Sequence, residues 1–74
     1  MMAVMRRQAV SSSTIASIGY DREEHLLEIE FVNGSVYRYR LVPESVHRDL
    51  MGAPSQGRFF NQRIRDVYPT EQVG

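Results

Sequence analysis

The sequence predicts an α+β domain: a three-stranded antiparallel β-meander with two short C-terminal helices packed on one face. Three observations lead to this fold class. Residues 26–41 alternate apolar with polar or charged side chains on both sides of an Asn-Gly pair, which is the pattern of a β-hairpin. Another alternating segment precedes the hairpin. Two segments with the apolar spacing of helices follow it.

The 74 residues are expected to hold one domain, over residues 11–69. Residues 1–10 show no period and are expected to form a flexible arm, and residues 70–74 a frayed tail. A domain of this size buries a modest core, so dimerisation would add useful stability.

The first predicted strand covers residues 14–20. Ala16, Ile18 and Tyr20 alternate with Ser17 and Gly19, as in a strand with one buried face. The charged residues after Tyr20 then supply a turn into the hairpin. Three strands are about the minimum for an independently stable sheet.

The register of the hairpin follows from which side chains must be buried. A two-residue loop at Asn33 and Gly34 would place arginines on the apolar face. A three-residue loop that includes Val32, with Gly34 in the left-handed conformation, keeps every side chain on a suitable face. The pattern therefore predicts a bulged hairpin. The pairs that it predicts are Ile29 with Tyr37, Leu27 with Tyr39 and Glu28 with Arg38.

The first helix is predicted over residues 44–51. Pro43 suits the first turn of a helix, where its missing N–H is not needed. Val46 and Leu50 lie four residues apart and share the apolar face. Gly52 is a natural end for this helix.

The second helix is predicted over residues 56–66. Ser55 is a suitable N-cap, because its hydroxyl can accept a hydrogen bond from a free N–H of the first turn. Phe60 and Ile64 form an apolar stripe that Val67 continues.

Composition excludes several classes of protein. There is no cysteine, so neither a disulfide framework nor a thiolate metal site is available. No segment approaches the ~18 apolar residues of a membrane span, and no secretory apolar region is present. We expect a soluble, cytoplasmic protein without a membrane partner.

The charges sum to zero but are unevenly distributed. Nine arginines balance nine acidic residues, and a zero sum argues against strong non-specific attraction to nucleic acid. Residues 38–65, however, carry six arginines and only two acids, Glu44 and Asp49. The C-terminal half is therefore locally basic.

Four segments in order, SSSTIASIGYD, LEIEFVNGSVYRY, VPESV and APSQGRFFNQRIRDVYP, resemble the KTSC domain family. The resemblance covers about residues 12–69. Its most specific part is the spacing from Tyr37 and Tyr39 to Ser55 and Gly57 and then to Phe60-Asn61. The family is named for its place at the C-terminus of some lysyl-tRNA synthetases and includes free-standing small bacterial proteins. The resemblance implies a role in RNA binding, suggested by the synthetase fusion.

Tyr37 and Tyr39 invite comparison with the aromatic platforms on which RNA bases stack. The predicted register places both rings on the apolar face that the helices must cover. We therefore interpret them as core residues.

The best candidate for an anion site is the start of the second helix. A helix N-terminus presents free N–H groups, Gly57 allows close approach, and Arg58 can add a bidentate contact. The alternative is structural, with Ser55 as an ordinary cap and Gly57 permitting tight packing beneath Pro54.

Four further arginines complete the candidate nucleic-acid surface. Arg63 and Arg65 could extend the anion site into a surface that follows phosphates. Arg38 and Arg40 lie on the open face of the sheet, where the alternative is a solvated strand paired with Glu28.

No residue set suggests catalysis, a metal or a cofactor. His25 and His47 belong to no spaced ligand motif, and there is no glycine-rich phosphate loop. The chain is also too short to enclose a deep pocket. We expect a protein that is not an enzyme.

Two functions are consistent with these observations. The first is a small binding module for RNA, tRNA included, that acts through the basic surface of the C-terminal helix. The second is a protein-interaction module, docking a protein partner or forming a homodimer through an exposed strand edge or the open sheet face.

Overall fold

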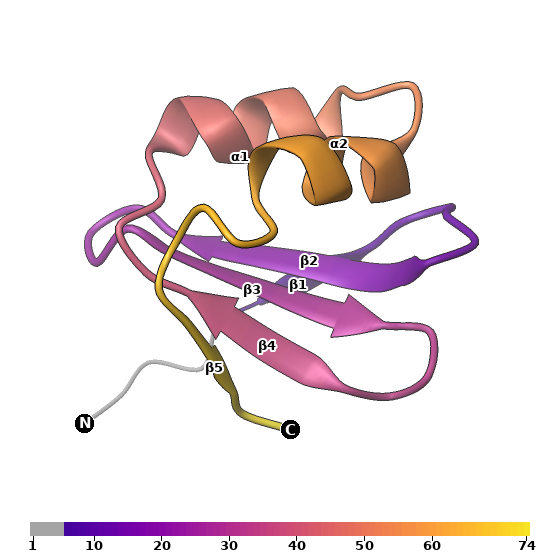
Figure 1. Cartoon of the computed structure of the whole chain (residues 1–74), viewed down its shortest axis with the longest axis horizontal. Helices are drawn as coiled ribbons and strands as arrows, with labels where there is room; N and C mark the ends of the chain where they lie inside the picture. Colours follow the sequence, from indigo (N-terminus) through magenta and orange to yellow (C-terminus); the bar gives the residue numbers. More distant parts are fainter. Residues whose placement is uncertain (1–5) are drawn as a thin grey trace.

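Two short helices lie over one face of a five-stranded antiparallel sheet in the computed structural model, which describes residues 6–74 (Figure 1). The predicted α+β class is confirmed, but the prediction of three strands is wrong. The strands follow one another across the sheet in chain order. They are β1 (Arg7–Ala9), β2 (Ile15–Asp21), β3 (Leu26–Phe31), β4 (Val36–Tyr39) and β5 (Thr70–Gln72), and the helices are α1 (Glu44–Met51) and α2 (Gln56–Arg63).

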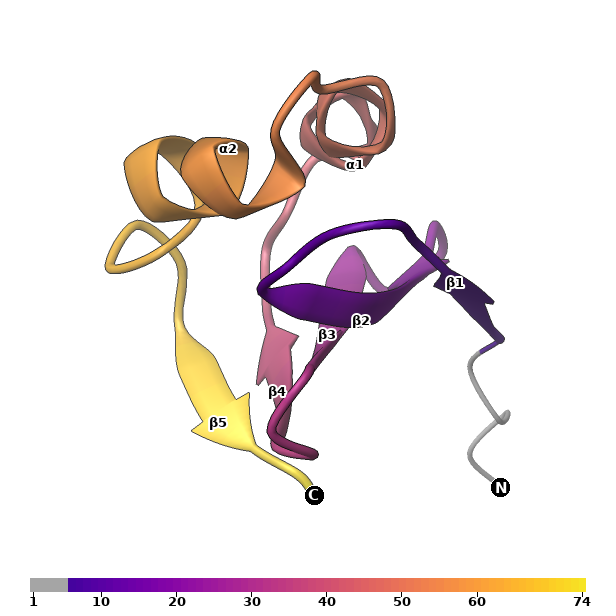
Figure 2. The same cartoon turned by 90° about the vertical axis from the view of Figure 1, so that its right-hand side faces the viewer.

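The two additional strands come from the segments expected to be an arm and a tail. β1 pairs with β2 and β5 pairs with β4, so they form the two edges of the sheet (Figure 2). Residues 1–5 of the predicted arm lie outside the described residues. Each new strand has three residues, all exposed, which is too short for an alternating pattern to show in the sequence. The pairing of the edge strands gives hydrogen-bond partners to backbone N–H and C=O groups of β2 and β4 that would otherwise have none in the sheet.

The central hairpin has the predicted register. Ile29 pairs with Tyr37, and Leu27 pairs with Tyr39. The Phe31 N–H donates to the carbonyl of Ser35 at 2.8 Å, which leaves a three-residue loop. Gly34 closes that loop at a φ of 95°, a conformation that glycine adopts without the steric cost of a side chain.

A bulge in β2 changes which residues enter the core. The register with β3 shifts between Ile15 and Ser17, so that Ile15 and Ile18 are both fully buried although they lie three residues apart. Ala16, which simple alternation placed on the buried face, is only half-buried.

The first helix has its predicted bounds, and Pro43 stands immediately before it as the N-cap residue. The second helix ends at Arg63, three residues earlier than predicted. There the Arg65 N–H donates to the carbonyl of Phe60, and Asp66 takes a left-handed φ of 61°. Aspartate tolerates this conformation better than most residues, and it turns the chain toward β5.

The core lies between the helices and the sheet. Its members are buried side chains contributed by three strands, both helices and their connections. They are Ile15, Ile18, Leu27, Ile29, Tyr39, Val42, Leu50, Phe60 and Ile64.

Candidate functional site

A groove of about 780 Å³ lies between the segment that joins β1 to β2 and the N-terminal half of α2. We call it the polar groove, because most of its lining side chains are hydroxyls and amides. Arg58 is charged, and no acidic residue is among the described residues that line the groove. Its polar members include Ser12, Thr14, Ser55, Arg58, Asn61 and Gln62.

The start of α2 is built as its sequence predicts. The Ser55 hydroxyl accepts a hydrogen bond from the N–H of Arg58 at 3.3 Å and so caps the helix. The N–H groups of Gln56 and Gly57 have no carbonyl one helical turn earlier, so they remain available to an incoming acceptor.

A glycine at position 57 is also required for packing. A Cβ atom at this position would lie 3.1 Å from the Thr14 Oγ1, tighter than normal packing allows. The glycine therefore lets the segment before β2 approach α2. Close packing was the structural alternative to an anion site, although the neighbour is Thr14 rather than Pro54.

A second groove, of about 430 Å³, lies where α2 and the turn after it meet β3 and β4. We call it the aromatic groove. Tyr39 and Phe60 line it but are only 4% and 6% exposed, as part of the core. Phe31 and Tyr37 are half-buried, and their rings meet edge to face with centroids 5.8 Å apart.

The two predicted core tyrosines therefore differ. Burial, with a smaller effect of Tyr37, raises the pKa of Tyr39 to about 12, so its phenol stays neutral at ordinary pH. Tyr37 lies closer to the surface, and its hydroxyl donates to the Gln72 Oε1 at 3.4 Å. Only Tyr37 keeps part of its ring accessible to a ligand.

Arg65 lines the aromatic groove, and Arg63 lines neither groove. The Arg65 Nε lies 3.9 Å from a carboxylate oxygen of Asp66, and both side chains are mostly exposed. The Arg63 guanidinium lies 5.5 Å from the centroid of the Phe59 ring, at cation–π distance. The sequence predicted one surface that runs from Arg58 to Arg63 and Arg65. In the structure Arg58 lines the polar groove and Arg65 lines the aromatic groove.

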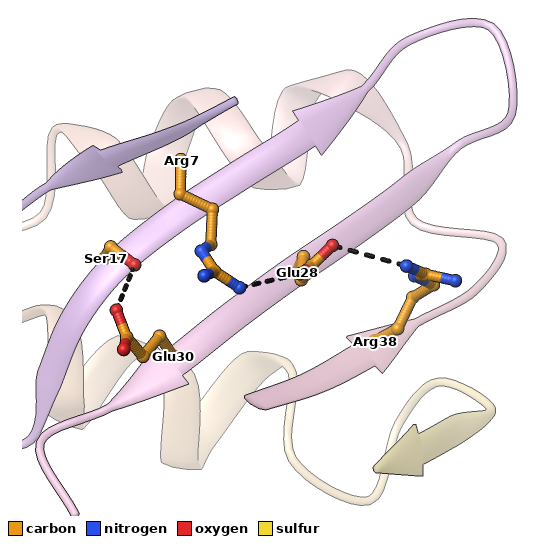
Figure 3. Close-up of polar contacts among 5 residues, drawn as sticks. All are labelled: Arg7, Ser17, Glu28, Glu30 and Arg38. Carbon is orange, nitrogen blue, oxygen red and sulfur yellow. Dashed lines mark hydrogen bonds and ion pairs between the residues drawn. The ribbon is translucent and has the colours of Figure 1, made fainter. Parts of the chain in front are cut away.

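The face of the sheet away from the helices carries a separate polar cluster (Figure 3). The Glu28 carboxylate lies 2.7 Å from Arg7 Nη1 and 3.5 Å from Arg38 Nη2. Glu28 is only 8% exposed. Beside it, the Ser17 hydroxyl donates to Glu30 at 2.8 Å.

Arg38 therefore has its predicted cross-strand partner and belongs to this cluster rather than to the helix side. Its Nε is buried and has no hydrogen-bond partner among residues 6–74. Arg40 follows β4, is exposed, and donates its backbone N–H to the carbonyl of Pro69. Arg7 was missed because the sequence before β2 has no recognisable period.

Neither histidine belongs to a cluster of metal-ligating side chains in the described chain. The His47 ring stacks on Tyr20 with centroids 4.8 Å apart, and burial lowers the pKa of His47. Within residues 6–74, no group of three or more His, Asp or Glu side chains is placed to hold a metal ion. In the same range, no helix is both long and apolar enough to cross a membrane.

The relatives of this chain are of two kinds, proteins that match it over most of their length and much longer lysine–tRNA ligases. The model of a family described as the KTSC domain matches residues 11–68. An uncharacterized protein of Stutzerimonas stutzeri is 50% identical over 58 residues, which are 78% of this chain and 82% of that protein. A lysine–tRNA ligase of Nostoc punctiforme is 44% identical over 61 residues, which are 82% of this chain but only 11% of the ligase.

A solved structure has the same fold. The crystal structure of a KTSC domain protein from Yersinia pestis superposes with a TM-score of 0.90 at 46% sequence identity. The match covers 96% of this chain and all of that one.

Proposed function

The chain belongs to the KTSC domain family, and from that premise we propose that it is a small non-catalytic module that binds RNA through the polar groove and the arginines of α2 and the following turn. Transfer RNA is the first RNA to test. The same domain forms a segment of lysine–tRNA ligases, whose name states that they act on tRNA.

The observation that carries the proposal is the polar groove. It combines Arg58, the free N–H groups at the start of α2 and a row of serine hydroxyls, with no carboxylate among the described residues that line it. These are groups that contact phosphate oxygens in nucleic-acid complexes. The groove therefore suits a sugar–phosphate backbone.

The distribution of charge supports the same face. α2 has two arginines and no acidic residue. On the opposite side of the sheet, Glu28 is already paired with Arg7 and Arg38. The net charge of the chain is zero, so the two arginines of α2 form a local excess of positive charge. A local excess of this kind favours contact with nucleic acid at one surface without strong general attraction.

The salt dependence of tRNA binding tests the proposal. Each phosphate contact to single-stranded RNA contributes about −0.7 to the slope of log K against log salt, so Arg58, Arg63 and Arg65 together predict a slope of about −2. Arg58→Gln should make the slope shallower by about 0.7. Binding is measured by fluorescence anisotropy at several salt concentrations.

Arg48→Gln is the matched control. Arg48 is an exposed arginine of α1 that lies 3.4 Å from Asp49, and it lines neither groove. Its removal should leave the slope unchanged. Equal slopes for the two variants, or no binding of tRNA at low salt, would contradict the proposed function.

A protein-interaction module is the second candidate. The outer edge of β5 is exposed along all three residues, and an exposed edge can pair with a strand of another chain. Its short length makes it a weak template, which ranks this function second. Sedimentation equilibrium that gives a monomer at all concentrations would remove self-association through this edge.

A further inference from the structure

We propose that the aromatic groove receives one unpaired base of a single-stranded RNA segment, while the adjoining phosphates lie in the polar groove. The inference rests on the proposed function, because it takes RNA to be the ligand. It assigns a second, chemically different subsite to the aromatic side chains of this groove, which make none of the proposed phosphate contacts.

The floor of the aromatic groove is suited to stacking. Phe31 and Tyr37 are half-buried and pack against the buried core. Phe31 is held edge to face by Phe60, with centroids 5.2 Å apart, so it loses little freedom when a ligand binds. A flat base is the nucleic-acid group that fits beside such rings.

The rim of the aromatic groove carries polar groups that are free to bind a ligand. Asn61 is exposed, and its amide offers both a donor and an acceptor to the edge of a base. In residues 6–74 its side chain takes part in no hydrogen bond. Among residues 6–74, the Arg65 side chain is paired only with the exposed carboxylate of Asp66, 3.9 Å away. This contact has little strength, so a phosphate or a base can replace it.

The two grooves adjoin each other. Thr14 and Asn61 line both of them, so one nucleotide can place its base in the aromatic groove and its phosphate in the polar groove. Bases in a duplex are stacked and paired and cannot enter such a groove. The geometry therefore selects loops, bulges or single-stranded ends.

The alternative occupant is an apolar side chain of a protein partner. The charges favour RNA, because Arg65 lies at the rim of the aromatic groove and Arg58 lines the adjoining groove. The single acidic residue among the described lining of both grooves is Asp66, whose side chain is 92% exposed. A ligand that combines an anionic group with a flat apolar group matches the chemistry of both grooves.

The test compares two labelled probes, a single-stranded RNA hexamer and an abasic ribose–phosphate hexamer with the same number of phosphates. Tyr37→Leu should weaken binding of the RNA hexamer about tenfold or more and leave the abasic hexamer unchanged. Tyr68→Leu is the control, because Tyr68 is a half-buried tyrosine that lines neither groove. It should change neither affinity.

The outcomes separate the two proposals. Wild-type protein that binds both hexamers equally, or a Tyr37→Leu variant that still prefers the RNA hexamer as wild type does, overturns the base subsite and leaves the phosphate groove standing. Failure of both hexamers and of tRNA to bind overturns the proposed function and the subsite with it. Should circular dichroism show that Tyr37→Leu is unfolded, Asn61→Ala replaces it, and an unchanged preference for the RNA hexamer then counts against the subsite.

Discussion

At the scale of single residues, Glu28 shows how a polar side chain can be buried on a face that no helix covers. It lies at the centre of β3, with Arg7 of β1 on one side and Arg38 of β4 on the other (Figure 3). Its carboxylate therefore links three strands, including an edge strand that has little other packing. The cross-strand pair with Arg38 could be predicted from the register. The contact with Arg7 could not, because it depends on how the segment before β2 folds back.

Replacement of Glu28 by glutamine tests this role. The variant keeps the shape but leaves two arginines without their carboxylate, one of them mostly buried, so we expect a loss of about 1–3 kcal/mol in the free energy of unfolding. Glu23→Gln, in the exposed turn after β2, should change it by less than about 0.5 kcal/mol. Both are measured by urea denaturation. A Glu28→Gln protein as stable as the control would show that the cluster contributes nothing.

At the scale of elements, the predictable parts are those where an alternating or helical pattern is long enough to be read. The hairpin register was predictable because a one-residue slip would have placed arginines in the core. The bounds of α1 followed from Pro43 and Gly52. The bulge in β2 interrupts alternation without a glycine to mark it, and the end of α2 depends on Asp66 in a left-handed conformation. Neither feature has a signal that simple periodicity detects.

The hairpin loop gives a prediction at this scale. Gly34→Ala places a side chain on a residue with a φ of 95°, where there is open space but unfavourable backbone geometry. We expect a loss of about 1 kcal/mol or more in the free energy of unfolding. Gly52→Ala is the matched control, because Gly52 has a φ of −93° and a new Cβ would make an ordinary contact at 3.7 Å. If the two variants were equally stable in urea, the predicted role of Gly34 would be wrong.

At the scale of the whole molecule, the candidate site is made by segments that are far apart in the sequence. Thr14, Tyr37 and Asn61 come together only because α2 lies across the sheet beside the segment that precedes β2 (Figure 1). The sequence indicated the start of α2 and the two tyrosines. The register also placed Arg38 on the open face beside Glu28, as the structure has it. The sequence could not show that Phe31 and Asn61 join the tyrosines in one groove, because a groove depends on tertiary packing.

The most direct test of RNA binding at this face is an NMR titration of the protein with a single-stranded RNA hexamer. We predict that the largest shifts occur at the amides of Gln56, Gly57 and Arg58, at the Asn61 side chain and at the ring protons of Tyr37. Inorganic phosphate should reproduce only the shifts at the start of α2. Shifts centred on Glu28 and Arg38 or on the edge of β5, or none at all at low salt, would contradict the account.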